Sequence, residues 1–205
     1  DLGGSGYTLT ATADGLDPGT SSNIDVVTKS PTTGTISSSE TWTVANSPYT
    51  VTGHVTVASG ATLTIEPGVT VKFDSDKVLE IEGTLVARGT ATSTVTFTSS
   101  AASPAAGDWG YIEFKTGSTG TTFNGEGGYV SGSIFEHCRV EYGGSYSNLV
   151  VVGAPYINSC TFTNNQGDGV VGAYRSGEPV KITNSTFTQN DAVAIYNPSD
   201  ATITG

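Results

Sequence analysis

Short groups of apolar residues, separated by Gly, Asp, Ser or Pro, recur along the chain from Trp42 onward. Within groups such as VTVKF and VTFTS the apolar and polar positions alternate, which is typical of strands that bury one face. Val, Ile, Thr, Tyr and Phe favour strands, and few long stretches lack Gly, Thr or Pro, so long helices are not expected. The pattern predicts an all-β chain of many short strands.

Three segments repeat one pattern towards the end of the chain: IFEHCRV, YINSCTF and KITNSTF. Their apolar positions correspond, so Phe135, Ile157 and Ile182 are predicted to form one interior column. The segments recur at nearly regular intervals with no helical segment between the strands, which indicates a solenoid. Each full turn of chain, or rung, is expected to stack on the previous one at about 4.8 Å.

The inward positions of each repeat fall at i, i+3 and i+5, and not at every second residue. This spacing indicates that a bend separates two strands within the repeat. The bend holds Cys138, then Cys160, then Ser185, and these small side chains are predicted to point inward in a stacked column. Stacked Cα atoms about 4.8 Å apart lie in the disulfide range, but parallel side chains at that spacing often fail the torsion requirement. Free, buried thiols are the favoured interpretation, and the sequence leaves the bonding of Cys138 and Cys160 open.

Four carboxylates are candidate calcium ligands. The segments TLTIEPG and VLEIEG align with each other, which predicts that Glu66 and Glu82 stack one rung apart. Stacked like charges repel, so these side chains must be well solvated or have a cation between them. Asp74 and Asp76 offer two more carboxylates in a turn, and such hard oxygen ligands favour Ca²⁺. No other cofactor is predicted.

The chain is predicted to divide into a strand pair at 1–27, a linker at 28–41 and a β-solenoid at 42–205. The first segment alternates apolar residues with Thr and then turns at Gly, Asp and Pro, as a β-hairpin does. Its pattern GYTLTA, GL and TSS resembles the last two strands of bacterial immunoglobulin-like repeats. A lone hairpin is marginal in water, so either the chain belongs to a longer protein or the hairpin pairs with another subunit.

The remaining segments resemble a known family. SPYTVTGHVTVASGATLTIEPGVTVKF, GTLVARGTATSTVTFTS and GDWGYIEF are similar to the opening rungs of secreted bacterial right-handed parallel β-helix proteins. INSCTFTNNQGDGV and ITNSTFTQNDAVAI resemble the generic repeat of the pectate-lyase-like superfold. The resemblance covers about residues 42–205 and implies a right-handed parallel β-helix. It does not imply one function, because this superfold carries lyases, hydrolases, adhesins and structural modules.

Candidate chemistry is sparse. The polygalacturonase motifs of the superfold, Gly-His-Gly and Arg-x-Lys, are absent, and no catalytic residue is assigned. The resemblance to lyases, which use Arg or Lys as a base, offers Arg139 and Arg175, but neighbouring Glu residues favour ordinary ion pairs. Trp109 and Tyr111, with Glu113, are the candidates for sugar stacking, and a packing role for these aromatics is the favoured interpretation.

The charge and composition restrict the partners. A formal net charge of −11 repels phosphate backbones, so nucleic acid is not expected as a partner. No run of 18 apolar residues occurs, so membrane insertion is not predicted. The acidic, Thr-rich and Lys-poor composition suits an extracellular or cell-surface location.

The leading hypothesis is a non-catalytic structural module of a secreted or cell-surface bacterial-type protein, for spacing, adhesion or head-to-tail self-assembly into an extracellular filament. ATITG stops within a repeat without a polar cap, so neighbouring copies or adjacent domains of a longer chain are expected to cover the end. The alternative is a polysaccharide lyase or a carbohydrate-binding β-helix module. Its candidate residues are Trp109, Tyr111, Glu113, Arg139 and Arg175. Whether the chain is an enzyme is left open, with a non-enzymatic role favoured.

Overall fold

The structure is a computed structural model of the chain. It describes residues 4–7, 10–11, 19–20, 24–26, 32–144, 149–151, 155–167, 171–173, 181–191, 195–196 and 202–204. The chain divides into two compact units, Asp1–Ser30 and Pro31–Gly205.

The first unit contains two antiparallel strand pairs. β1 (Gly4–Tyr7) pairs with β4 (Ile24–Val26), and β2 (Thr10–Ala11) pairs with β3 (Gly19–Thr20). In sequence β2 and β3 lie between β1 and β4, which is the strand order of one hairpin with an inner and an outer strand pair. This agrees with the antiparallel strands predicted from the alternating Thr and apolar residues.

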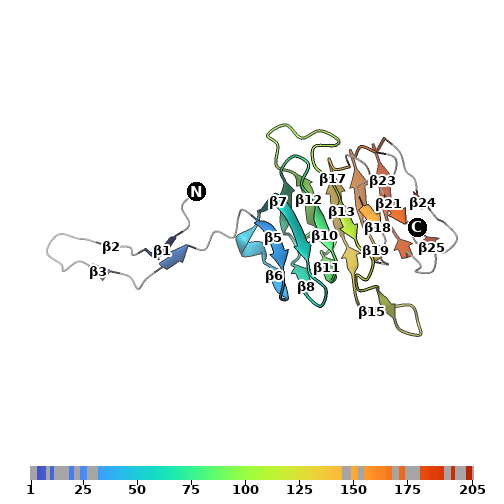
Figure 1. Cartoon of the computed structure of the whole chain (residues 1–205), viewed down its shortest axis with the longest axis horizontal. Helices are drawn as coiled ribbons and strands as arrows, with labels where there is room; N and C mark the ends of the chain where they lie inside the picture. The colour runs from blue at the N-terminus through green and yellow to red at the C-terminus, as the bar shows by residue number, and fades with distance from the viewer. Residues whose placement is uncertain are drawn as a thin grey trace. The chain divides into compact units, whose positions relative to one another are not determined.

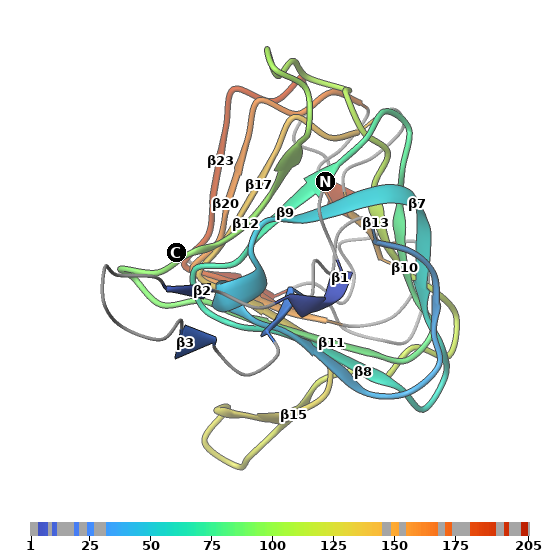
Figure 2. The same cartoon turned by 90° about the vertical axis from the view of Figure 1, so that its left-hand side faces the viewer.

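The second unit is a parallel β-solenoid of about six rungs with three faces around one interior (Figures 1 and 2). Face 1 is a seven-stranded sheet, and faces 2 and 3 are parts of one twelve-stranded sheet that bends at β7. Face 1 consists of β6 (Glu40–Trp42), β8 (Thr62–Ile65), β11 (Thr84–Arg88), β16 (Ile134–Glu136), β19 (Tyr156–Asn158), β22 (Lys181–Thr183) and β25 (Thr202–Thr204). Face 2 consists of the first half of β7 (Tyr49–Val57), β9 (Thr70–Phe73), β12 (Val95–Ser99), β17 (Cys138–Glu141), β20 (Thr161–Thr163) and β23 (Thr186–Thr188). Face 3 consists of β5 (Thr32–Ile36), the second half of β7, β10 (Leu79–Ile81), β13 (Ile112–Phe114), β18 (Leu149–Val151), β21 (Val171–Ala173) and β24 (Ile195–Tyr196).

The coil is right-handed. In Figure 2 the chain passes from face 1 (β8) through face 2 (β9) to face 3 (β10) in a clockwise sense as it recedes from the viewer. This is the hand that twisted parallel strands prefer. The long strand β7 turns a corner, since Tyr49–Val51 pair with β9 on face 2 whereas Val55–Val57 pair with β10 on face 3. An all-β, right-handed parallel β-helix was the predicted fold class, and it is confirmed.

The predicted interior column is present. Phe135 pairs in register with Ile157, and Ile157 pairs with Ile182, and all three side chains are buried. Alternation explains the burial, because β8 and β9 each place every second residue inside. The interior is filled with Val, Ile, Leu and aromatic side chains, among them Trp42 stacked on Tyr49 with ring centroids 4.8 Å apart.

The solenoid starts earlier than the sequence indicated. Residues 32–36 and 40–42, placed in the predicted linker or at its border, form β5 and β6 and pair with β7 and β8. Their Thr-, Ser- and Gly-rich composition resembles a linker, because each strand has few apolar positions to bury. Trp42 is one of them, and it is fully buried.

The bend column is also as predicted. His137, Ser159 and Asn184 each adopt a positive φ, near 50°. Of the residues that follow them, Cys138 and Cys160 are buried and Ser185 is half-buried. Each of these three side chains donates a hydrogen bond to the carbonyl oxygen two residues before it: Cys138 to Glu136 at 3.4 Å, Cys160 to Asn158 at 3.3 Å and Ser185 to Thr183 at 2.9 Å. Cys and Ser therefore share one position because both fit a tight corner and donate this bond.

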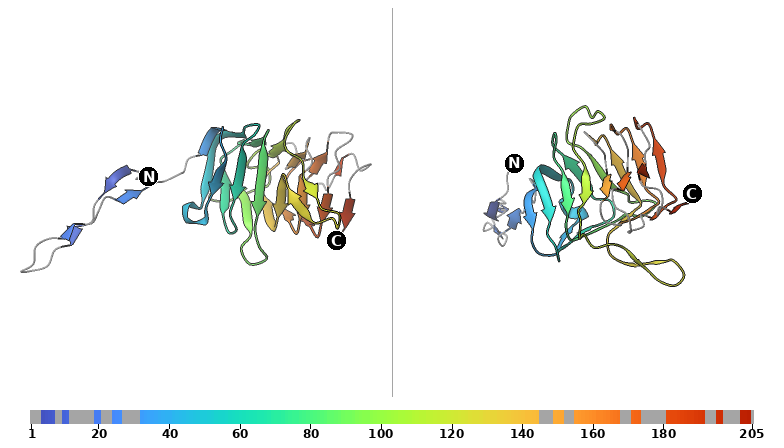
Figure 3. Two further views of the ribbon diagram at one scale, coloured as in Figure 1. Left: turned by 90° about the horizontal axis from the view of Figure 1, so that it is seen from below. Right: turned by 45° about the vertical axis from the view of Figure 1, so that its right-hand side comes forward.

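Two segments leave the solenoid between its strands. Residues 100–108 form a loop after β12, and β14 (Thr122–Phe123) pairs antiparallel with β15 (Tyr129–Ser131) in a projecting hairpin (Figure 3). A short 3₁₀ helix, η1, spans Val44–Asn46. Within the described residues, no helix has the length and apolar character needed to cross a membrane.

Candidate functional site

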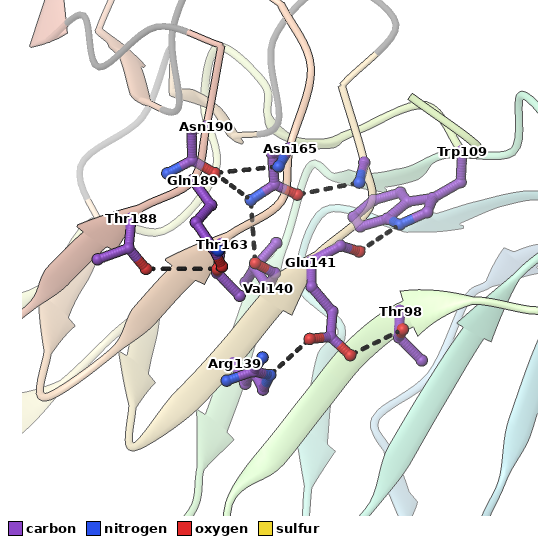
Figure 4. Close-up of polar contacts among 11 residues, drawn as sticks. Thr98, Trp109, Arg139, Val140, Glu141, Thr163, Asn165, Thr188, Gln189 and Asn190 are labelled. Carbon is purple, nitrogen blue, oxygen red and sulfur yellow. Dashed lines mark hydrogen bonds and ion pairs between the residues drawn. The ribbon is translucent and has the colours of Figure 1, made fainter. Parts of the chain in front are cut away.

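The indole of Trp109 lies in the core, so it offers no face to a sugar. Its side chain is fully buried, and its ring stacks on Phe73 with centroids 4.2 Å apart. Its Nε1 donates a hydrogen bond to the carbonyl oxygen of Glu141 at 2.9 Å (Figure 4). The assignment of Trp109 to a sugar-stacking platform is therefore wrong, and the packing interpretation holds.

Arg139 is held in an ion pair on the outer surface of face 2. Its Nε lies 2.5 Å from Oε2 of Glu141, two residues further along β17, and Thr98 on β12 donates to the other carboxylate oxygen at 3.1 Å (Figure 4). This is the ordinary ion pair that the neighbouring Glu predicted. Arg175, the second candidate base, lies outside the described residues.

Stacked carboxylates occur on face 3, at residues other than those predicted. Glu80 on β10 pairs in register with Glu113 on β13, one rung on. Lys115 bridges them, with its Nζ 2.8 Å from Glu80 and 2.6 Å from Glu113. Both hydrogen bonds raise the pKa of Lys115 above its ordinary range, and the bond to Glu113 contributes more than the bond to Glu80. The cation required between stacked like charges is thus a lysine of the chain itself.

Glu66 and Glu82 do not stack, which corrects the predicted register. β8, which precedes Glu66, pairs with β6 and β11 on face 1, whereas β10, which precedes Glu82, pairs with β7 and β13 on face 3. The carboxylate of Glu66 accepts a hydrogen bond from the backbone N–H of Val44 at 3.0 Å. The two similar segments therefore lie on different faces rather than on successive rungs of one face.

Glu82 and Glu113 come together at a shallow depression of about 330 Å³ on face 3. Its lining residues are Ser59, Glu82, Glu113, Lys115, Thr116 and Gly117. Because the Lys115 ammonium already neutralises Glu113, this depression holds an internal ion pair beside one exposed carboxylate, that of Glu82.

Tyr111 lies just before β13, and its carbonyl oxygen accepts the N–H of Leu79 at 3.0 Å.

A second depression, of about 390 Å³, lies where β9 and β12 end. Its lining residues are Asp74, Ser75, Ser99, Ser100, Ala101, Gly107 and Asp108. Ser100 donates to Asp74 at 2.6 Å, and Asp108 accepts from Ser99 at 2.7 Å. Asp76 has a positive φ of 61° and is exposed, outside this lining. Among the described residues no three His, Cys, Asp or Glu side chains converge as metal ligands, so calcium binding stays a prediction.

An amide ladder closes the corner after face 2, and the sequence does not reveal its bonds. Asn165 is buried; its Nδ2 donates to the carbonyl oxygen of Val140 and to Oδ1 of Asn190, each at 3.0 Å, and its Oδ1 accepts the N–H of Gly143 at 2.9 Å (Figure 4). Asn190 repeats the pattern one rung later by donating to Phe162. The sequence signal is the shared spacing of the two Asn residues after corresponding strands.

A second ladder, also missed, runs along the outside of face 1. Arg88 pairs with Glu136 at 2.7 Å, and Asn158 donates to the same carboxylate at 3.0 Å. Thr183 then donates to Asn158 at 2.7 Å, so four successive rungs are linked. Although desolvation opposes the shift, the bonds from Arg88 and Asn158 lower the pKa of Glu136. Arg88 and Glu136 lie far apart in the sequence, which explains why the sequence did not pair them.

The geometry therefore defines a parallel β-solenoid whose outer charges pair along and between rungs. The chain belongs to the family of pectate-lyase-like β-helix domains, whose family model matches residues 34–150. A segment of 51 residues, 25% of this chain, is 49% identical to Protein bark beetle of Drosophila melanogaster, and it covers 2% of that protein. The chain thus spans a very small part of that relative. No solved structure gives a significant match.

We predict that Lys115→Met will destabilise the solenoid modestly and in a salt-dependent manner. Without the ammonium, Glu80 and Glu113 face each other as like charges, which should cost about 1 kcal/mol at low ionic strength. Urea denaturation at low and high NaCl measures this. Millimolar Ca²⁺ should raise the melting temperature of the variant more than that of the wild type.

The matched control is Lys72→Met. Lys72 lies on the outside of β9, and no carboxylate lies within ion-pair distance of it among the described residues. Its replacement should change stability little at any salt concentration. Equal losses in the two variants would contradict the bridging role of Lys115.

We predict that the two buried thiols are protected in the native state. Both cysteines are free and buried, and desolvation raises the pKa of the Cys138 thiol, helped by the adjacent Cys160. An unfolded thiol ionises above about pH 8.5, whereas the native one stays neutral. Stability should therefore be fully present below that pH and fall as pH rises above it, by at most about 1.4 kcal/mol per unit.

Urea denaturation between pH 7 and 10, with thiol titration of the native protein, tests this. Cys138→Ser keeps the corner hydrogen bond, as Ser185 does, and should show a smaller alkaline loss of stability. Rapid modification of both thiols in the native protein at pH 8 would contradict their burial.

Proposed function

We propose that this chain is a non-catalytic structural module of a secreted or cell-surface protein. In this proposal the solenoid is a rigid spacer, and its outer faces serve adhesion or self-assembly. The observation that supports it most is the pairing of charged groups between rungs. Arg88 ties β11 to β16 on face 1, and Lys115 ties β10 to β13 on face 3.

The same contacts weigh against the candidate residues of a lyase. A general base must reach its substrate with a free, positioned group, and its partners must converge on one site. Arg139 instead pairs with Glu141, Glu113 pairs with Lys115, and Trp109 is buried. Individual surface ion pairs contribute little to stability, but pairs that join successive rungs resist sliding and splaying of the sheets.

An assay on a panel of uronate polymers with millimolar Ca²⁺, monitored for unsaturated products, tests the proposal. We expect no turnover. Clear turnover would overturn the structural role and support the polysaccharide lyase, and loss of that turnover in Arg139→Met would identify the base. Retention on polysaccharide affinity gels without turnover would support a carbohydrate-binding module instead.

Head-to-tail assembly is part of the same proposal. The terminal rung of any parallel solenoid carries backbone groups that another strand can pair, and a contact of this kind propagates into a filament. Sedimentation velocity and electron microscopy over a rising concentration series should show elongated particles. Isolated particles at the highest concentration would remove assembly from the proposal and leave the spacer role.

A further inference from the structure

The outer surface of face 1 has a covered patch. On β16, Phe135 points into the core, so Ile134 points outward, in register with Val86 and Tyr156 on the neighbouring rungs. Ile134 is nevertheless fully buried, although it does not belong to the interior cluster of apolar side chains. A strand that buries consecutive residues has cover on both sides. A second layer must therefore lie over Ile134.

The β14–β15 hairpin is the segment that the contacts place on this side of face 1. In Figure 2 the hairpin lies outside the sheet that contains β8 and β11. The ring of Phe123 on β14 meets the ring of Tyr156 edge to face, with centroids 5.2 Å apart. Arg88 lies over the ring of Tyr129 on β15, 5.2 Å from its centroid. The hairpin thus contacts the rungs on both sides of Ile134.

Lys181 on β22 holds the tip of the hairpin. Its ammonium lies 4.4 Å from the ring centroid of Phe123 and 5.1 Å from that of Tyr156, and it donates to the carbonyl oxygen of Gly127 at 3.1 Å. A cation between two aromatic rings is a recognised attractive arrangement, but it is modest where solvent has access. Residues 122–128 are all exposed, so this latch is weak compared with the core.

The base of the hairpin is firmly fixed. Thr121 donates its hydroxyl to the carbonyl oxygen of Ser133, and Ser133 donates its N–H to Thr119 at 3.2 Å. At Gly132, with φ +95°, a Cβ would lie 2.0 Å from the carbonyl oxygen of Gly120, so the two strands touch there. A rigid base and a weakly held arm together make a hinge.

We propose that the β14–β15 hairpin is a hinged strap, closed over Ile134 and Tyr156 by the Lys181 and Arg88 latches, whose opening exposes an apolar strip on an otherwise polar face. The strap controls access to face 1 in the intact module. Its closed state covers the strip, and its open state exposes Ile134 and the ring of Tyr156 together.

Cysteine labelling measures the opening. Ile134→Cys places a thiol beneath the strap, while Cys138 and Cys160 in the core report global unfolding in the same molecule. Mass spectrometry should show singly labelled protein long before triply labelled protein. Adding Lys181→Met should raise the rate of single labelling about tenfold. Lys181→Arg retains a cation and should restore a rate close to that of Ile134→Cys alone.

Lys72→Met, which removes a lysine from face 2, is the control and should leave the labelling rate unchanged. Phe123→Ala removes the other partner of the latch and should also accelerate single labelling. If all three thiols react together, or if neither Lys181→Met nor Phe123→Ala changes the rate, the hairpin is a fixed part of the fold and the strap is refuted.

Discussion

Replacing Trp109 with alanine should lower the free energy of unfolding by about 4 kcal/mol. The indole is fully buried and stacks on Phe73, so its removal leaves a large cavity and strips one side of a core aromatic. It also leaves the carbonyl oxygen of Glu141 without its donor. Urea denaturation followed by circular dichroism measures the loss, since the far-ultraviolet signal does not depend on the missing indole.

Two further variants separate the contributions at this position. Trp109→Phe keeps a ring to stack on Phe73 but loses the Nε1 donor, so its cost should be smaller, about 1 to 2 kcal/mol. Val44→Ala truncates a side chain that is 55% exposed and should cost less than about 0.5 kcal/mol. If Trp109→Ala had almost the stability of the wild type and abolished polysaccharide binding, the indole would be a surface group after all.

Asn165→Ala should cost about 3 kcal/mol, a large effect for a polar side chain. The substitution removes the partner of the Gly143 N–H and of the Val140 carbonyl oxygen. It also removes the side-chain bond to Asn190 and leaves only the bond to Asn190 from the backbone N–H of residue 165. Buried backbone groups without partners are expensive, at about 1 to 3 kcal/mol each. Thermal and urea denaturation should both register the loss.

A charged variant gives this second prediction a pH dependence. Asn165→Asp keeps an acceptor for Gly143 but buries a carboxylate, whose folded-state pKa must rise. The stability relative to wild type should therefore be highest below the unfolded pKa of about 3.9 and fall as pH rises. Asn46→Ala, which removes an exposed amide from η1, is the control and should be nearly neutral. A pH-independent difference for Asn165→Asp would contradict a buried ladder.

Much of the fold follows from local pattern. The alternation in VTVKF and VTFTS identifies strands and their buried residues, because successive side chains of a strand point to opposite sides. The three late repeats also identify their own register. Phe135, Ile157 and Ile182 stack as predicted, since equal motifs at matching corners leave one arrangement that keeps every apolar residue inside.

Pairing among the early rungs does not follow from local pattern. Leu63 pairs with Leu85 on face 1, rather than with Leu79, its counterpart in the most similar segment. Alternation states which side chains point inward, but each rung has three strands on three faces and loops of unequal length. The most similar segment in sequence can therefore lie on another face. This is why the prediction that Glu66 and Glu82 stack is wrong.

The sequence by itself determined an all-β solenoid, its interior residues and the inward column of Cys138, Cys160 and Ser185. Only the tertiary structure decided which polar groups meet. It placed Lys115 between Glu80 and Glu113, and it brought Phe123 of the β14–β15 hairpin against Tyr156 on face 1. The physical reason is range: strand periodicity is set by neighbouring residues, whereas ion pairs and covering contacts depend on which rungs become adjacent, which the whole stack of sheets determines.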